Sequence, residues 1–387
     1  MTKPLFSIKQ GGPTSWAIRI ACAVVLAYVV LWIPTSGSNS LIDTATTALT
    51  LMGAALSLNL LLGFTGQISL GHSAFFGVGA YTTAIFVTRW GWSPLKTLPI
   101  AFVVAFVVGA LVSLPALRIK GVYLALVTLT LGVVFPQFIK WPKIEWLTGG
   151  SRGLVDTGFK FDKNNRTFEI FGWNPWGNLR GENVKPFYFW IAVMIVVIIY
   201  LICRGLVKSR VGRSLIAIRD NNTAAAVMGV NLALTKGMVF GLSAAMCALP
   251  GCLTAMKGTV TPDSALLTVA GSITFLIVMV IGGAGSLWGP IIGAIVFQFI
   301  TEKTSNWIEP DEIPGIFRPI FSWSKTAPSG GIFALSLIAL MFVAPLGLAG
   351  LWKRLIGRIV AVVPQPVGTA TLGIPTWEVE EPPSATK

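Results

Sequence analysis

The side chains best suited to bind a small solute are four polar groups in one glycine-rich stretch, GFTGQISLGHSAFFGVGAY, at residues 63–81. They are Gln67, Ser69, His72 and Ser73. Their amide, hydroxyl and imidazole groups are uncharged hydrogen-bond donors and acceptors, which an amphipathic solute with charged ends would need. Buried polar side chains of membrane helices also bond to neighbouring helices, so helix packing alone is the alternative. We interpret His72 as a packed, neutral histidine rather than a proton carrier.

A second glycine-rich stretch, GGAGSLWGPIIGA at residues 282–294, has a similar pattern later in the chain. Its candidate residues are Gly282, Gly283, Gly285 and Ser286. Glycine lets membrane helices approach closely, or breaks a helix where a cavity satisfies the freed backbone groups. Similar broken segments in the two halves of a chain indicate an internal pseudo-repeat with a translocation path. The two stretches therefore predict a path lining, with tight helix packing as the alternative.

The absence of certain residue types and motifs from the sequence argues against several functions. The apolar segments contain almost no carboxylates, because Asp43 and Glu302 stand near segment ends. This argues against proton-driven transport, although sodium coupling through backbone carbonyls stays open. The phosphate-binding pattern G-x-x-x-x-G-K-[ST] is absent, as are a Ser/His/Asp set and paired carboxylates. The four cysteines have no metal-binding spacing and there is a single histidine. We expect neither catalysis nor a cofactor bound by this chain.

The composition indicates the elements that must position these groups. Of 387 residues, 54% are hydrophobic and 11% are charged, whereas soluble domains have about a quarter charged residues. We therefore predict an all-α, polytopic membrane protein with about ten transmembrane helices. The net charge of +14 lies largely in short loops beside spans, where it meets anionic lipid, so we expect no nucleic acid. The predicted spans are 17–34, 41–62, 67–88, 99–117, 121–140, 187–203, 237–256, 266–283, 286–302 and 331–349.

The distribution of basic residues predicts the orientation. With ten spans, every concentrated basic cluster falls on one side, which is the cytoplasmic side by the positive-inside rule. Both termini are then cytoplasmic. The long segment 141–186 has nearly balanced charges and four tryptophans, which we expect at the membrane–water interface. The predicted divisions are a cytoplasmic N-terminus at 1–16, a transmembrane domain at 17–350 with a cytoplasmic loop at 204–236, and a proline-rich, disordered cytoplasmic tail at 351–387.

The polar sequence RGLVKSRVGRSLIAIRDNNTAAAVMGVN at residues 204–231 is a second functional candidate. Its first half is basic and fixes orientation. Its second half is typical of a short helix with a small, alanine-rich face, capped by Asp220 or Asn221, that could dock on a partner. A solvated loop that only sets topology is the alternative. The candidate docking residues are Arg213, Arg219, Asp220, Asn221, Ala224, Ala225, Met228 and Gly229.

Four ordered blocks of the chain resemble the permeases of branched-chain amino acid ABC transporters, and the longer-loop member of the two paired permeases most. The resemblance covers about residues 41–350, and one departure is Pro250, which stands where the family has small residues and favours a kink. The blocks are GQISLGHSAFFG at 66–77, LRIKGVYLA at 117–125, GRSLIAIRDNNTAAAVMGVN at 212–231 and GGAGSLWGP at 282–290.

The resemblance implies a permease like those of type II ABC importers, in the bacterial inner membrane. Its implied partners are a second homologous permease, two cytoplasmic ATPases that use the ATP, and an external substrate-binding protein. The implied cargo is a branched-chain or other aliphatic amino acid, and the 212–231 block would dock on an ATPase. The same machine importing urea, short amides or another small organic solute is one alternative. A stand-alone secondary transporter is another, and a membrane-embedded enzyme is disfavoured because no catalytic cluster is present.

Overall fold

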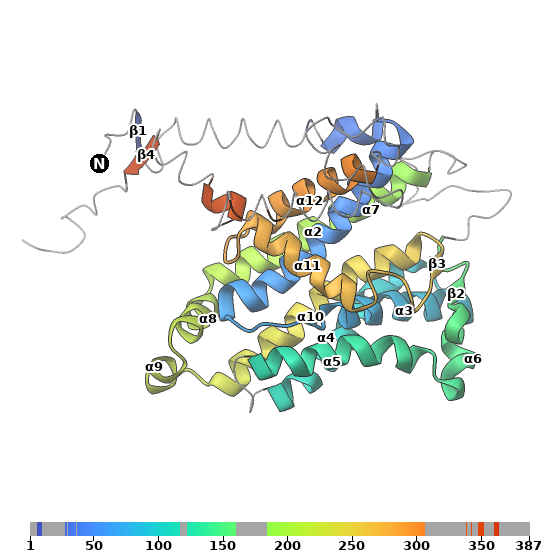
Figure 1. Ribbon diagram of the computed structural model, residues 1–387, viewed down its shortest axis with the longest axis horizontal. Coiled ribbons are helices and arrows are strands. Elements are labelled where there is room, and N and C mark those ends of the chain that lie inside the picture. The colour runs from blue at the N-terminus through green and yellow to red at the C-terminus, as the bar shows by residue number, and fades with distance from the viewer. Residues whose placement is uncertain are drawn as a thin grey trace, which may run out of the picture. The chain divides into compact units, whose positions relative to one another are not determined.

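The computed structural model separates the chain into two units, 1–31 with 352–387, and 32–351 (Figure 1). It describes residues 6–9, 28, 30–35, 37–116, 122–159, 184–305, 338, 342, 347–351 and 360–363. In the first unit, strand β1 (Phe6–Lys9) pairs in parallel with β4 (Val360–Val363). Strand β4 lies in the tail that the sequence predicts to be disordered, and the remainder of that tail after residue 351 lies outside the described residues.

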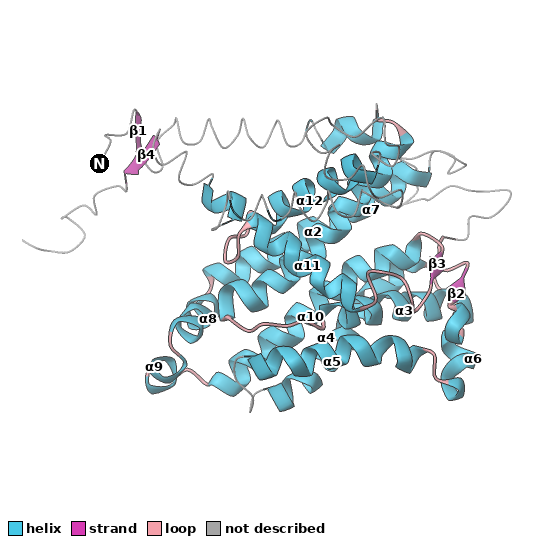
Figure 2. Cartoon of the chain, in the orientation of Figure 1, coloured by secondary structure: helices cyan, strands magenta, loops and turns pink. Residues whose placement is uncertain are grey.

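The second unit is built almost entirely of helices (Figure 2). Its larger helices are α2 (Asn39–Thr65), α3 (His72–Trp90), α4 (Pro94–Ala116), α5 (Val122–Ile139), α7 (Val184–Lys208), α10 (Leu232–Met256), α11 (Val269–Gly282) and α12 (Gly289–Ser305). The shorter elements are η1 (Pro142–Ile144), α6 (Glu145–Thr148), η2 (Gly150–Arg152), β2 (Leu154–Val155), α8 (Arg210–Asp220), α9 (Asn222–Val227) and β3 (Thr259–Val260).

Eight of the ten predicted spans coincide with these larger helices. The first and tenth, 17–34 and 331–349, lie mainly outside the described residues, although 30–35 and 347–351 are helical. Among the described residues, α2, α4, α7 and α10 are long and apolar enough to cross a membrane. The pair Tyr123–Ile139 and Pro142–Thr148, bent by 60°, would make a fifth span. The protein is therefore an all-α, multi-pass membrane protein.

Helices α2 and α10 form the buried centre of the second unit, and α3 packs against α10 without space for larger side chains. A Cβ atom at Gly79 would lie 2.0 Å from the carbonyl oxygen of Ala248, and one at Gly251 would lie 2.0 Å from that of Phe76. Small residues are what allow membrane helices to approach this closely. Helix α10 continues through Pro250, beside Gly53 of α2.

Three of the predicted spans begin three to five residues later than the sequence pattern indicates. One is 266–283, which begins at Val269, and glycines interrupt the other two. Helix α2 ends at Gly66, whose left-handed conformation (φ 69°) stops the helix, and residues 66–71 are not helical before α3 begins. The predicted span 67–88 is thus wrong at its first residues. Likewise, residues 283–288 separate α11 from α12, so the predicted span 286–302 begins instead at Gly289. Gly283 and Gly285 have positive φ, which interrupts the helix.

The two ends of the second unit carry different short elements, as Figure 1 shows. At one end, α8 and α9 stand where the sequence predicts a single short helix in the second half of 204–231; we call this the α8–α9 end. At the other, β2 pairs antiparallel with β3, so the start of the predicted loop 141–186 is structured; this is the β2–β3 end. Trp141 and Trp146 are exposed there, whereas the other two tryptophans of the loop lie outside the described residues.

Candidate functional site

His72 joins three helices at the centre of the second unit. Its Nδ1 lies 3.0 Å from Ser69 Oγ, and its Nε2 lies 2.9 Å from Ser243 Oγ, midway along α10. Ser243 donates its own proton to the carbonyl of Ser57 in α2 at 2.6 Å. Because that proton is used, Ser243 accepts from Nε2–H, and Nδ1 accepts from Ser69. Both ring nitrogens of a neutral imidazole are thus satisfied, as the interpretation of His72 as a packed histidine requires.

Helices α5 and α11 also bind this turn. The backbone N–H of Ser73 donates to Ser272 Oγ at 2.8 Å, and Ser272 Oγ in turn donates to Ser73 Oγ at 2.8 Å. The N–H of Leu70 donates to Thr128 Oγ1 at 2.9 Å. A Cβ atom at Gly71 would lie 2.0 Å from the carbonyl oxygen of Thr128. Four helices therefore fix where α3 begins.

Sequence reasoning missed the partners of this turn, which are Ser57, Thr128, Ser243 and Ser272. Each is a small hydroxyl residue in an apolar helix that also contains other Ser or Thr residues, so the sequence alone does not single out these four. The predicted path residues Ser69, His72 and Ser73 are fully buried and bonded within the chain. In this conformation they hold the turn in place through these hydrogen bonds.

The non-helical segment before the turn leaves polar groups unpaired at membrane depth. It runs from Gly66 at the α8–α9 end to His72, level with the middle of α10. Among the described residues, no hydrogen bond satisfies the carbonyl groups of residues 66–70 or Gln67 Nε2. Gly66 and Ile68 are exposed. Non-helical backbone at this depth occurs only where protein covers it or where it lines a water-filled cavity. The segment 66–71 must therefore be covered by protein or line a water-filled cavity.

The two glycine stretches meet directly. Asn59 of α2, fully buried, accepts from the N–H of Gly285 at 2.9 Å and donates to the carbonyl of Ser286 at 2.9 Å. A Cβ atom at Gly63 would lie 2.5 Å from the nitrogen of Gly285. The end of α2 and the 283–288 segment are therefore in backbone contact, with the side chain of Asn59 bonded to backbone groups of two consecutive residues, Gly285 and Ser286.

Gly282 and Gly283, the other candidates in this stretch, are buried in close backbone packing. A Cβ atom at Gly282 would lie 1.8 Å from the carbonyl oxygen of Gly289 at the start of α12. Gly283 lies against Gly347, where a Cβ atom would be 2.3 Å from the Cα of Gly283. The structure thus places both glycines in packing contacts, whereas Ser286 is half-buried.

The α8–α9 segment displays two apolar side chains at its tip. Asn221, one of the two candidate caps, accepts from the N–H groups of Thr223 at 2.9 Å and Ala224 at 3.0 Å and begins α9. Val227 and Met228 are 82% and 83% exposed. Exposed apolar side chains side by side, on a short capped helix outside the bundle, are suited to fill a hollow on another protein.

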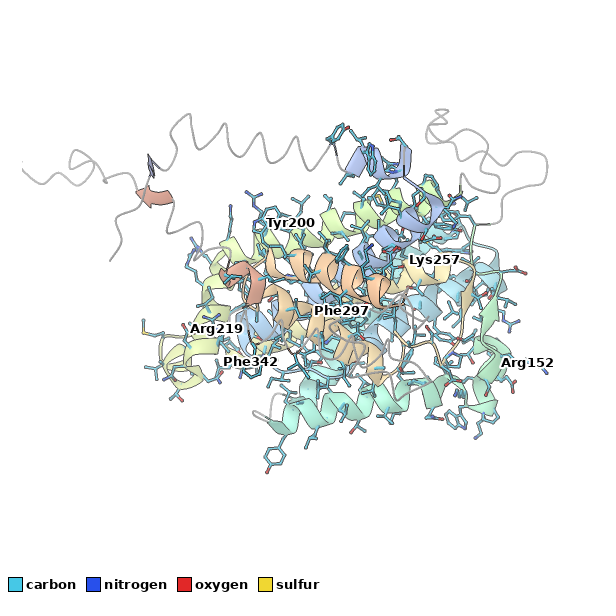
Figure 3. The ribbon with its side chains drawn as sticks, turned by 45° about the horizontal axis from the view of Figure 1, so that its top comes forward. Arg152, Tyr200, Arg219, Lys257, Phe297 and Phe342 are labelled. Atoms are coloured by element: carbon cyan, nitrogen blue, oxygen red, sulfur yellow. The ribbon has the colours of Figure 1, made fainter. Side chains whose placement is uncertain are left out.

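The remaining predicted docking residues divide into two groups. Ala225 is 3% exposed and packs inside the segment, whereas Arg219 is exposed but reaches the bundle through its hydrogen bond to Gly63; Figure 3 labels Arg219. The others are exposed, and they are Arg213, Asp220, Asn221, Ala224, Met228 and Gly229.

Two ion pairs among the described residues lie near the β2–β3 end. Lys140 pairs with Asp263 at 2.6 Å, and Lys185 pairs with Asp43 at 2.5 Å. Asp43 is thus at the end of its helix, as the sequence indicates. Within the described ranges, no group of three His, Cys, Asp or Glu side chains could hold a metal ion. The charged groups within the described ranges do not form a relay across the membrane.

Comparison with known proteins supplies the family. A family profile described as "Branched-chain amino acid transport system / permease component" matches residues 40–321. The chain is 31% identical to the high-affinity branched-chain amino acid transport system permease protein LivM of Escherichia coli, over 75% of this chain and 69% of that protein. It is 26% identical to the galactose/methyl galactoside import permease protein MglC of Salmonella typhimurium, over 76% and 85%. No solved structure matches. The chain belongs to the family of branched-chain amino acid transport system permeases.

Proposed function

We propose that this chain is a permease subunit of an ATP-driven importer for branched-chain and other aliphatic amino acids. A second homologous permease completes the path, two ATPases supply the energy, and an external binding protein delivers the amino acid. The observation that carries the proposal is the non-helical segment 66–71, because it presents unpaired polar backbone at membrane depth. The family to which the chain belongs supports the cargo and the partners.

The path is proposed to run along this segment. Gly66 and Ile68 are exposed along it, and the unpaired backbone carbonyl groups of 66–70 can accept hydrogen bonds from an ammonium group or from water; Gln67 Nε2 is buried in this conformation and is a donor without a partner among the described residues. The segment is held in place by hydrogen bonds of Ser69, His72 and Ser73 within the chain. Asn59 holds the neighbouring stretch that contains Gly285 and Ser286. Selection of the amino acid then depends on backbone shape and on the binding protein more than on charged side chains.

The energy is proposed to enter at the α8–α9 end. This end faces the cytoplasm, because the basic residues of 204–236 are retained there, and both termini lie on the same side in the bacterial inner membrane. Val227 and Met228 insert into an ATPase, with Arg213 and Asp220 at the rim of the contact. ATP is bound and hydrolysed on the partner chains. When the ATPases close, they push α9 and switch access to the path.

Reconstitution tests the proposal. The chain is co-expressed with a second permease, the ATPase and the binding protein encoded beside it, and the purified complex is placed in proteoliposomes. We expect labelled leucine, isoleucine or valine to accumulate when ATP is present on the ATPase side. Urea and galactose serve as competing cargoes. Urea is the alternative cargo considered from the sequence, and galactose is included because relatives of this chain are named for galactose import. Uptake of urea or galactose in preference to leucine would contradict the cargo. Uptake by this chain alone, abolished by collapse of an ion gradient, would contradict the importer.

A further inference from the structure

We infer that Arg219 transmits movement of the α8–α9 segment to both glycine stretches, and that Asn59 is the second member of this link. The inference rests on the proposed docking of α9 on an ATPase and goes beyond it, because it names the contact by which the push reaches the path. Arg219 is a positioning residue in this account, since its side chain contacts backbone at the base of the path rather than the transported solute.

The guanidinium group of Arg219 binds the end of α2. Its Nη1 donates to the carbonyl of Gly63 at 3.1 Å, and its Nε lies 3.2 Å from the carboxylate of neighbouring Asp220, which orients the group. Gly63 stands in the last turn of α2, where the negative end of the helix dipole favours a cation. The stem of Arg219 also covers Gly66, where a Cβ atom would lie 3.2 Å from its Cγ. Gly66 is the first residue of the non-helical segment 66–71.

The same guanidinium group reaches the second glycine stretch. A Cβ atom at Gly285 would lie 3.5 Å from Nη1 of Arg219 and 3.2 Å from the carbonyl oxygen of Gly63. Asn59, one helical turn before Gly63, holds Gly285 and Ser286 by its side-chain amide. The end of α8, the end of α2 and the 283–288 segment therefore meet at one point.

This junction can transmit a push because its parts differ in rigidity. Helix α2 is a continuous, buried helix, whereas the backbones on either side, 66–71 and 283–288, are non-helical. A displacement of α8 must either carry the end of α2 with it or break a charge-assisted hydrogen bond. Rigid elements bonded end to end, with hinge residues beside them, are the usual means of such coupling.

Arg219 differs in this respect from the other basic residues of the 204–231 sequence. Those residues are Arg204, Lys208, Arg210 and Arg213. All four are exposed, and among the described residues their side chains make no hydrogen bond. Their positive charge suits retention on the cytoplasmic side, which requires no specific partner. The contact of Arg219 with Gly63 is therefore not a consequence of the loop's charge alone.

The test measures uptake and ATP hydrolysis on the same proteoliposomes containing the complete complex. We expect Arg219→Gln and Asn59→Asp each to lower the amount of leucine taken up per ATP by about tenfold, within the range of ordinary coupling energies, while ATP hydrolysis continues. Asn59→Asp keeps the acceptor for Gly285 but loses the donor for Ser286. Arg219→Lys, which keeps a charged donor, should restore part of the ratio. Arg210→Gln removes an equal charge from α8 and should leave the ratio unchanged.

The outcomes separate the link from the proposed function. A wild-type ratio in either Arg219→Gln or Asn59→Asp would overturn the link, with the importer intact. An equal fall in Arg210→Gln would also overturn it, since the effect would then be one of charge. Absence of ATP-driven uptake by the wild-type complex would instead overturn the proposed function. If Arg219→Gln does not assemble, Asn59→Asp decides, because Asn59 lies away from the docking surface.

Discussion

Nε2 of His72 lies 2.9 Å from the hydroxyl oxygen of Ser243, which in turn donates a hydrogen bond to the carbonyl of Ser57. This chain of hydrogen bonds ties α3, α10 and α2 together where α3 begins. It explains how a helix can start at membrane depth, because each polar atom of the imidazole has a partner within the protein.

Ser243→Ala removes the acceptor of the imidazole N–H and should destabilise the protein. An unpaired buried donor costs about 1–3 kcal/mol, so the thermal midpoint of the detergent-purified protein should fall. Thr130→Ala is the control, because the Thr130 hydroxyl is exposed and bonds only to Leu126 of its own helix. Equal midpoints for the two variants would contradict the role given to the chain from His72 to Ser57.

Gly63→Ala should destabilise the junction of the two glycine stretches. The new Cβ would lie 2.2 Å from Asn59 Oδ1 and 2.5 Å from the nitrogen of Gly285, and overpacking of this kind costs about 1–3 kcal/mol. Gly205→Ala is the matched control in α7, where a Cβ meets nothing within 4 Å. The control should be neutral or stabilising by up to about 1 kcal/mol. A thermal midpoint for Gly63→Ala at or above that of the control would contradict the close packing.

Met228→Asp should weaken binding of the ATPase without unfolding the α8–α9 segment. The side chain is 83% exposed, so the change affects a partner rather than this chain, and loss of a central apolar contact weakens an interface about tenfold or more. Co-purification of the ATPase at graded salt and detergent concentrations measures it. Thr223→Asp adds the same charge at the start of α9, where a helix tolerates an acid, and should retain the ATPase.

Retention of the ATPase by Met228→Asp would contradict the docking surface. Ala225→Arg should act on the α8–α9 segment itself, in contrast to Met228→Asp, which acts on the contact with the ATPase. Because Ala225 is buried, an arginine there should destabilise the segment itself, and protease digestion of the purified chain without partners should then cut 209–231 faster.

Much of the helix order follows from the sequence, because runs of apolar residues long enough to span a membrane are a local signal. Eight predicted spans coincide with helices for this reason. The starts of α3 and α12 could not be predicted in the same way. They depend on contacts between residues far apart in the chain, such as Leu70 with Thr128 and Gly285 with Asn59. A local pattern does not contain such pairings.

For the candidate site, too, the sequence indicates which stretches matter but not which residues are in contact. The glycines at 63–81 and 282–294 indicate both stretches, but the sequence does not show that Gly63 and Gly285 touch. Ala225 resembles its neighbour Ala224 in the sequence, yet only Ala224 is exposed, because α9 packs with Ala225 against the rest of the segment. Asn59 has no local signal beyond being polar in an apolar helix. Its role depends on a partner more than two hundred residues away.

The central claim is that the non-helical segment 66–71 lines a water-accessible path, and thiol labelling of Ile68→Cys in the membrane-embedded complex tests it most directly. Ile68 is 37% exposed, and Cys203, Cys247 and Cys252 are buried, so Cys22→Ser completes the background. Val107→Cys on α4 is the control, because Val107 is 50% exposed on an apolar span and should face lipid, where thiolates do not form. We predict that a water-soluble maleimide labels Ile68→Cys and not Val107→Cys, and that leucine with ATP changes the rate. Equal, negligible labelling of both cysteines would contradict the account.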